Sequence, residues 1–287
     1  MNRRVRDDAD TVPGTTEDDR VEQPGPVSER GPALRVSDLR RAFDDRQALD
    51  GLTLHVDSGE VVALLGPNGA GKTTAMRCIA GVLVADSGDI DVLGAPVGSV
   101  TAQTGISYLP EHPDLYPGLT VDEHLRFVAL AHDLHDWEPR ADELIARFAL
   151  DDLRGELPGA MSQGMRRKAA LSMALLHGAR VLLLDEPFNG LDPQAAAELR
   201  AVVTDLAAQG VAVLISTHGL ATADRIADRS VVMVRGRVLA EGSTRALRAR
   251  AATGDDADLE TVFLRLTEPD AFPGDAADAP GGPADAP

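Results

Sequence analysis

The chain carries the stretch Gly66-Pro67-Asn68-Gly69-Ala70-Gly71-Lys72-Thr73-Thr74 directly after the apolar run Val61–Leu65. Its spacing matches the pattern G-x-x-x-x-G-K-[ST], in which a glycine-rich loop joins a strand to a helix. Glycines let the backbone fold around an anion, so that successive N–H groups and the next helix N-terminus point at phosphate oxygens. Lys72 then reaches the outer phosphates and the Thr73 hydroxyl faces a Mg²⁺ ion. An ordinary glycine-rich turn is the alternative, but the strand and helix flanking the loop argue against it.

Other short apolar runs, bounded by Gly, Pro or Asp, follow along the chain: Val181–Leu184, Val211–Ile215 and Val231–Val234. The first two, like Val61–Leu65, are continuously apolar, which is typical of parallel strands covered by helices on both faces. Between the runs lie the helix-like stretches Ala75–Leu83, Met165–His177 and Gln194–Gln209. This alternation predicts an α/β fold with a parallel sheet. Arg235 and Gly236 form a candidate turn, so we expect a hairpin over Val231–Glu241.

The domain organisation follows from changes in composition. Residues 1–31 and 268–287 are rich in Asp, Pro, Gly or Ala and poor in large apolar side chains, so we expect a disordered acidic arm and tail. One domain is expected over residues 32–267. Within it, roughly residues 104–160 show helical spacing, with a candidate capping box at Thr120 and Glu123, and predict an inserted helical subdomain.

Charge and cysteine content exclude several classes of protein. Of the 287 residues, 46 are acidic and 28 basic, which gives a formal charge of −18 and argues against a nucleic-acid partner. The one cysteine, Cys78, cannot form an internal disulfide, and we expect it to pack inside the fold. The chain shows no apolar start typical of a secretory signal and no apolar run long enough to span a membrane. We therefore expect a cytosolic protein whose contact with a membrane runs through a partner.

Acidic residues end the second apolar run, where Asp185 and Glu186 follow Val181–Leu184. In a strand parallel to Val61–Leu65, Asp185 lies beside Thr73 and can hold Mg²⁺ directly or through water. Glu186, one residue later, is then free to polarise an attacking water molecule. The alternative is a strand that simply ends in acids at a turn.

His218 stands just past the run Val211–Ile215, at the edge where the carboxyl ends of parallel strands meet. We therefore expect His218 to contact the terminal phosphate and to orient Glu186. On its own, a histidine is more often structural than catalytic, and only its position favours the functional interpretation. The other six histidines show no grouping that predicts a metal site.

Further motifs occur in a fixed order along the chain. Before the acidic strand end stands Met161-Ser162-Gln163-Gly164-Met165, and after it come Gly190-Leu191-Asp192-Pro193 and Ser216-Thr217-His218. With Phe43, the loop 66–74 and Tyr108-Leu109-Pro110-Glu111, this series resembles the ATP-binding cassette family over roughly residues 33–267. A plain capped helix with a basic first turn is the alternative interpretation of residues 161–168.

The resemblance implies a P-loop NTPase fold, with a RecA-like parallel sheet, an antiparallel β subdomain and an inserted helical subdomain. It implies ATP as the nucleotide, with Phe43 stacking on adenine and Thr73, Glu111 and Asp185 holding Mg²⁺. The family commonly has glutamine where this chain has Glu111, so Mg²⁺ dependence is a point of difference. The resemblance also assigns nucleotide contacts to four residues beyond the loop: Ser162, Gln163, Gly164 and Asp192.

The helix N-terminus at Ser162 and Gly164 is a second anion site, too far from the loop in such a fold to share one nucleotide within a chain. Two chains facing head to tail solve this, because each offers Ser162 to the phosphate bound at the other's Lys72. We thus expect an ATP-hydrolysing subunit that dimerises, as a homodimer or a heterodimer, around two Mg-ATP.

The end Leu259–Thr267, together with Glu111, resembles the branch that pairs with a separate integral-membrane permease and mostly exports. This places the subunit at the cytoplasmic face of the cell membrane, bound through the permease. The alternatives are a chromosome, DNA-repair or ribosome-acting ATPase and a regulator with an inactive site. The short span between the two phosphate motifs, the single cassette, the acidic charge and the presence of Lys72, Glu186 and His218 argue against them.

Overall fold

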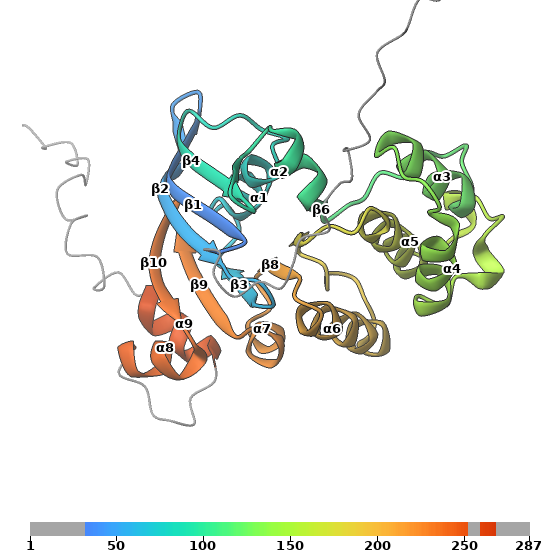
Figure 1. The fold of residues 1–287 in the computed structure, drawn as a ribbon. Helices are drawn as coiled ribbons and strands as arrows, with labels where there is room; N and C mark the ends of the chain where they lie inside the picture. The colour runs from blue at the N-terminus through green and yellow to red at the C-terminus, as the bar shows by residue number, and fades with distance from the viewer. Residues whose placement is uncertain (1–31, 252–258, 268–287) are drawn as a thin grey trace, which may run out of the picture. The chain divides into compact units, whose positions relative to one another are not determined.

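Strand β3 (Val61–Leu65), which precedes the glycine-rich loop, lies inside a six-stranded sheet of order β10-β9-β3-β8-β7-β6 (Figure 1). The other five strands are β6 (Ile106–Leu109), β7 (Val181–Asp185), β8 (Ala212–Thr217), β9 (Arg229–Val234) and β10 (Arg237–Gly242). Strands β6, β7, β8, β3 and β9 run parallel, and only β10 is antiparallel to its neighbour. The three buried parallel strands and the hairpin predicted from the sequence are confirmed.

This computed structural model describes residues 32–251 and 259–267, which belong to one compact unit. The acidic arm expected over 1–31 and the tail expected over 268–287 lie outside the described residues. Among the residues that are described, no helix combines the length and the apolar character needed to cross a bilayer.

A second sheet, of order β2-β1-β4-β5, is antiparallel throughout. It consists of β1 (Leu34–Phe43), β2 (Arg46–Val56), β4 (Ser87–Val92) and β5 (Ala95–Pro96). Alternate residues of β1, among them Leu34 and Val36, are fully buried and belong to the same core cluster as α1 (Lys72–Ile79). The antiparallel β subdomain expected from the family resemblance is therefore present.

Helices cover both faces of the parallel sheet because its buried strands present apolar side chains on each side. Along β3, Val62 and Leu64 join the cluster that contains α1, whereas Val61 belongs to the cluster of α5 and α6. Ala63 and Leu65 pack with the C-terminal helices. The helices concerned are α5 (Gln163–Leu176), α6 (Pro193–Ala208), α7 (Leu220–Ile226), α8 (Thr244–Arg250) and α9 (Leu259–Thr267). Cys78 of α1 is buried, and burial raises the pKa of its thiol to about 11, as suits a packing residue.

The helical subdomain needs a corrected boundary. Residue 104, the expected start, lies in the short helix α2 (Val100–Gly105), and the residues that follow form strand β6 of the parallel sheet. The sequence does not reveal strand β6, because it is only four residues long and polar Ser107 interrupts its apolar residues. Its place in the sheet comes from its pairing with β7. The helical part consists of α3 (Val121–Ala131) and α4 (Glu138–Arg147), followed by the 3₁₀ turns η1 (Asp151–Leu153) and η2 (Pro158–Ala160). The capping box predicted at Thr120 and Glu123 begins α3.

Candidate functional site

A cavity of about 750 Å³ opens at the carboxyl end of β3. The loop between β3 and α1 forms its floor, while the turn between β1 and β2 and two acidic side chains form its walls. The lining residues are Phe43, Asp44, Asp45, Arg46, Ala48, Pro67, Asn68, Gly69, Ala70, Gly71, Lys72, Thr73, Thr74, Glu111 and Glu186. The predicted phosphate loop, Phe43, Glu111 and Glu186 thus meet around one space.

The loop backbone explains why glycines are needed here. Gly71 has φ 105°, and a Cβ added to it would stand 2.4 Å from the carbonyl oxygen of Ala48. A Cβ on Gly66 would stand equally close to the Met233 carbonyl oxygen. Gly71 precedes α1 and offers no side-chain cap, and the first turn of α1 contains no acidic residue. The amide groups at this helix N-terminus are therefore suited to bind an anion.

Lys72 is nearly buried, with 6% of its surface exposed. Its Nζ donates a hydrogen bond of 2.7 Å to the Gly66 carbonyl and lies 3.4 Å from Oε1 of Glu186. The ammonium group therefore stands between the loop backbone and the acidic end of β7, where a phosphate above the loop can reach it.

Asp185 and Glu186 are both buried at the end of β7. Oε2 of Glu186 lies 3.0 Å from Nδ1 of His218, so the predicted pairing of these residues is present in the geometry. Glu186 has φ 45°, a left-handed conformation that is strained for a residue with a side chain. Its backbone N–H donates to Oγ of Ser216, which keeps the turn in place.

Two hydroxyl groups hold Asp185, a feature that the sequence motifs do not reveal. Ser216 Oγ donates to one carboxylate oxygen, and the Tyr108 hydroxyl donates to the other over 3.3 Å. Burial and the Asp185 charge raise the pKa of Tyr108 to about 12, so its hydroxyl keeps its proton. Tyr108 lies on β6, the strand that the sequence analysis missed, which is why the contact was not anticipated.

The side chains expected to hold Mg²⁺ supply suitable donors. Thr73, Asp185 and Glu111 offer hydroxyl and carboxylate oxygens, the hard ligands that Mg²⁺ prefers beside substrate phosphates. Oε1 of Glu111 accepts a 2.9 Å hydrogen bond from Asn189, so Asn189 orients this carboxylate at the cavity rim. In the described ranges, no group of three or more His, Cys, Asp or Glu is placed to hold a metal ion.

Phe43 lies at the cavity wall with 43% of its surface exposed. The guanidinium carbon of Arg41 lies 4.8 Å from its ring centroid and covers one face, which leaves the ring suited to stack on a base. Arg46, a lining residue that no motif indicated, donates a 3.4 Å hydrogen bond to the Gly69 carbonyl.

The remaining predicted residues lie elsewhere. Ser162 is the N-cap of α5, and Gln163 and Gly164 form its first turn. Asp192 caps α6, where its carboxylate accepts a hydrogen bond of 2.8 Å from the Ala195 N–H. None of these four residues is among the described residues that line the 750 Å³ cavity. The structure therefore brings the loop, Glu111 and Glu186 to one cavity, with His218 against Glu186. Ser162, Gly164 and Asp192 do not line that cavity, whereas Gln163 shares a neighbouring cavity of about 410 Å³ with Glu111.

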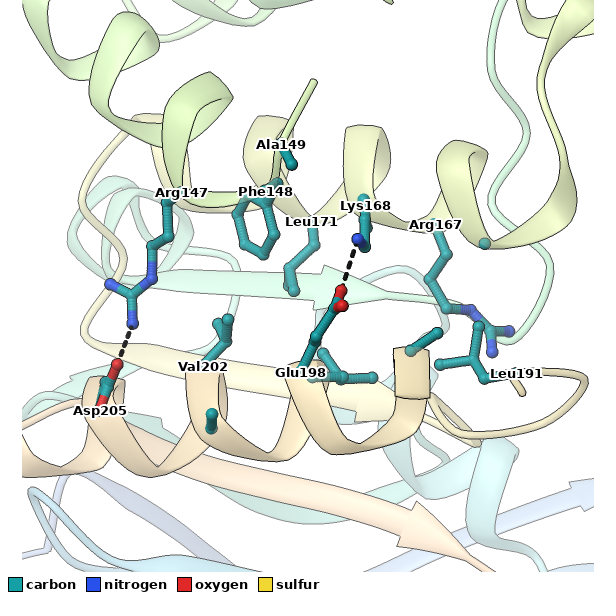
Figure 2. Close-up of a pocket in the computed structure, with 14 residues that line it drawn as sticks. Arg147, Phe148, Ala149, Arg167, Lys168, Leu171, Leu191, Glu198, Val202 and Asp205 are labelled. Carbon is teal, nitrogen blue, oxygen red and sulfur yellow. Dashed lines mark hydrogen bonds and ion pairs between the residues drawn. The ribbon is translucent and has the colours of Figure 1, made fainter. Parts of the chain in front are cut away.

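A further cavity of about 360 Å³ lies between α5 and α6 (Figure 2). Lys168 reaches from α5 to Glu198, and Arg147 pairs with Asp205 across the same gap. Lys168 and Arg147 are therefore neutralised by carboxylates over an apolar floor, while the Arg167 guanidinium donates to backbone carbonyls.

The comparison with protein families matches residues 49–189 to the family described as ABC transporter. The chain is 35% identical over 217 residues to the lipopolysaccharide export system ATP-binding protein LptB of Haemophilus influenzae, covering 73% of this chain and 90% of the relative. It is 40% identical over 228 residues to the daunorubicin resistance ATP-binding protein DrrA3 of Streptomyces coeruleorubidus, covering 78% and 72%. A solved ATP-binding subunit of an ABC transporter superposes with a TM-score of 0.77 at 36% identity, covering 82% of this chain and all of that one.

Proposed function

This chain belongs to the ABC transporter family as an ATP-binding, ATP-hydrolysing subunit, and on that premise we propose that it dimerises around two Mg-ATP and drives export through a separate permease. The observation that carries the proposal is the cluster at the carboxyl ends of β3, β7 and β8. There the phosphate loop, Lys72 and Glu186 line one cavity, and His218 contacts Glu186.

The cluster supports hydrolysis by direct attack of water. The loop amides and Lys72 bind the terminal phosphates, and Phe43 stacks on the base. The water oxygen forms a bond to the γ-phosphorus, the bond from that phosphorus to the bridging oxygen breaks, and Glu186 takes a proton from the water. His218 keeps the Glu186 carboxylate in place. Mg²⁺, held by Thr73, Asp185 and Glu111, would neutralise charge on the phosphate oxygens.

The position of the signature residues supports dimerisation. Ser162 and Gly164 stand at a helix N-terminus without acidic residues in its first turn, a suitable phosphate partner. In the described chain these residues do not line the cavity that contains Lys72. A second ATP-binding subunit, identical or a paired relative, would bring its own Ser162, Gln163, Gly164 and Asp192 equivalents over that cavity.

Exposed apolar side chains on the helical subdomain support a permease partner. Tyr116, Phe127 and Leu130 are each about half exposed or more, and Tyr116 and Phe127 pack edge to face with centroids 5.4 Å apart. Clustered exposed aromatics are typical of protein interaction surfaces. The names of LptB and DrrA3 concern export and drug resistance, which favours export and a position at the cytoplasmic face of the membrane.

Two measurements on the tagged full-length chain test this function. A phosphate-release assay is expected to show Mg²⁺-dependent ATP hydrolysis, and capture from detergent-solubilised membranes is expected to retain an integral-membrane protein at high salt. Capture of nucleic acid in place of a membrane protein would favour the DNA- or ribosome-acting alternative, and absent hydrolysis would favour an inactive regulator.

A further inference from the structure

Arg167, in the second turn of α5, contacts two loops at once. Its guanidinium donates to the carbonyl oxygens of Pro187 and Asn189 over 2.6 and 2.7 Å and to the carbonyl oxygen of Glu111. Only 3% of the residue is exposed. One side chain of α5 thus joins the segment after β7 to the segment after β6.

This arrangement differs from an ordinary buried ion pair. Among the described residues, no carboxylate lies within ion-pair distance of Arg167, and its Nε has no hydrogen-bond partner. Burial lowers the pKa of the guanidinium, so the charge is held at a cost. A neutral side chain would cost less to bury, and this cost is offset by the attraction of the Glu111 charge and by hydrogen bonds to carbonyls that are fixed in direction.

The two neighbouring cations of α5 make different contacts. Lys168 forms an exposed ion pair with Glu198, and Arg166 donates to carbonyls of residues 158 and 161 just before its own helix. In Figure 2, Lys168 reaches across to α6 whereas Arg167 leaves the helix toward the loop that carries Leu191. Of these three side chains, Arg167 is the one with hydrogen bonds to the segments that follow β6 and β7 among the described residues.

Both segments carry residues of the proposed site. Pro187 directly follows Glu186, and the Asn189 side chain donates to Oε1 of Glu111. Arg167 therefore fixes the backbone at both Glu111 and Asn189, whose side chains are joined by a hydrogen bond. Arg167 itself lies five residues after Ser162, the N-cap of α5.

We propose that Arg167 is a positioning residue that sets Glu111 and Glu186 relative to the signature end of α5, so that it controls turnover more than ATP affinity. This inference rests on the proposed function, because it assigns a role within the same site. Arg167 does not line the cavity of the phosphate loop, so its loss leaves the phosphate contacts of Lys72 in place. A displacement of about 1 Å in a reacting group can lower a rate by up to about 10²-fold.

The test compares wild type, Arg167→Gln and Arg167→Lys by phosphate release, with ATP and Mg²⁺ each varied. Arg147→Gln is the matched control, since Arg147 forms its ion pair with Asp205 outside the cavity of the phosphate loop. For Arg167→Gln we expect kcat to fall about tenfold or more, KM for ATP to stay within about twofold, and half-maximal activity to need more Mg²⁺. Arg167→Lys is expected to lie between, because a lysine cannot reach three carbonyls with the same fork.

Circular dichroism and the fluorescence of Trp137, the one tryptophan, report whether each variant is folded. A folded Arg167→Gln with wild-type kcat overturns the proposal, and so does an equal loss of kcat and ATP affinity. If Arg167→Gln does not fold, Arg167→Lys decides: reduced kcat at constant KM supports the role, and wild-type kcat refutes it. If the wild-type chain does not hydrolyse ATP, the proposed function fails and the role of Arg167 fails with it. If the wild-type chain hydrolyses ATP, the variants test the role of Arg167 separately.

Discussion

Glu186 combines a buried charge with a strained backbone, both of which are unfavourable for the stability of the fold. It is buried, has a left-handed backbone and stands between Lys72 and His218. Strain of this kind persists where the surrounding structure holds a side chain for a purpose. The sites of these three residues were predictable from the sequence because each follows a strand, and parallel strands end at one edge.

Replacing Glu186 with glutamine keeps the size of the side chain and removes the base. We expect ATP hydrolysis to fall about 10²-fold or more while ATP binding persists, because the amide cannot accept a proton from water. Phosphate release and calorimetric ATP titration of the same protein measure the two effects. Turnover at the wild-type rate would contradict the role given to Glu186.

Lys72→Ala should act on binding. Removing the ammonium deletes a charge-assisted phosphate contact, worth about 1.5–3 kcal/mol or more than tenfold in affinity. Calorimetry with ATP and Mg²⁺ provides the measurement, and Lys168→Ala, which removes the half-buried lysine of α5 that pairs with Glu198, provides the control. Tight ATP binding by Lys72→Ala would show that the loop does not bind phosphate in the way proposed.

Other residues of the site could not be found from the sequence. Tyr108 reaches Asp185 from 77 positions away and Asn189 reaches Glu111 across 78. Arg167 acts through backbone carbonyls, which every residue possesses. Such contacts depend on how β6, β7 and α5 pack, and no local pattern of residue types encodes that packing.

Among the elements, the loop between β3 and α1 was the easiest to predict, because glycine spacing and a flanking apolar strand occur together. Strand β6 was missed and the bulged strands β1 and β2 were not located, since short or irregular strands leave little period in the sequence. Their places are determined by pairing with neighbours already in the sheet.

Gly71→Ala tests the close approach in this loop. Gly71 and Gly98 both have positive φ, but an added Cβ would clash with the Ala48 carbonyl only at Gly71, since nothing lies within 4 Å at Gly98. The left-handed conformation costs about 1–2 kcal/mol in either alanine variant, so the additional loss at Gly71 measures the clash. Thermal unfolding should show a larger decrease for Gly71→Ala, together with loss of ATP binding. Equal decreases would contradict the geometry of the loop.

Thr120→Ala tests the start of α3. The Thr120 hydroxyl accepts from the Glu123 N–H and the Glu123 carboxylate accepts from the Thr120 N–H. Loss of an N-cap typically costs about 1 kcal/mol, which corresponds to roughly 2–4 °C in a domain of this size. Thermal unfolding of Thr120→Ala beside Thr101→Ala, an exposed threonine in α2, provides the comparison. An equal midpoint for the two variants would exclude a stabilising cap.

At the scale of the whole molecule, the proposed function divides the nucleotide site into two parts. One half is the cavity with Lys72 and Glu186, and the other is formed by the N-termini of α5 and α6. With a formal charge of −18, two copies repel each other at long range, so assembly needs a specific ligand between them. The family resemblance predicted this division, and it stays a prediction that the mass of the ATP-bound protein tests.

The most direct test of this account is the mass of Glu186→Gln in solution with saturating ATP and Mg²⁺, measured by light scattering after size exclusion. The account predicts a shift from 30.2 kDa to about twice that mass, and no shift when Lys72→Ala is added to the same protein. A cleavage-deficient chain that binds ATP yet keeps the mass of a single copy, alone and with its permease, would contradict the account.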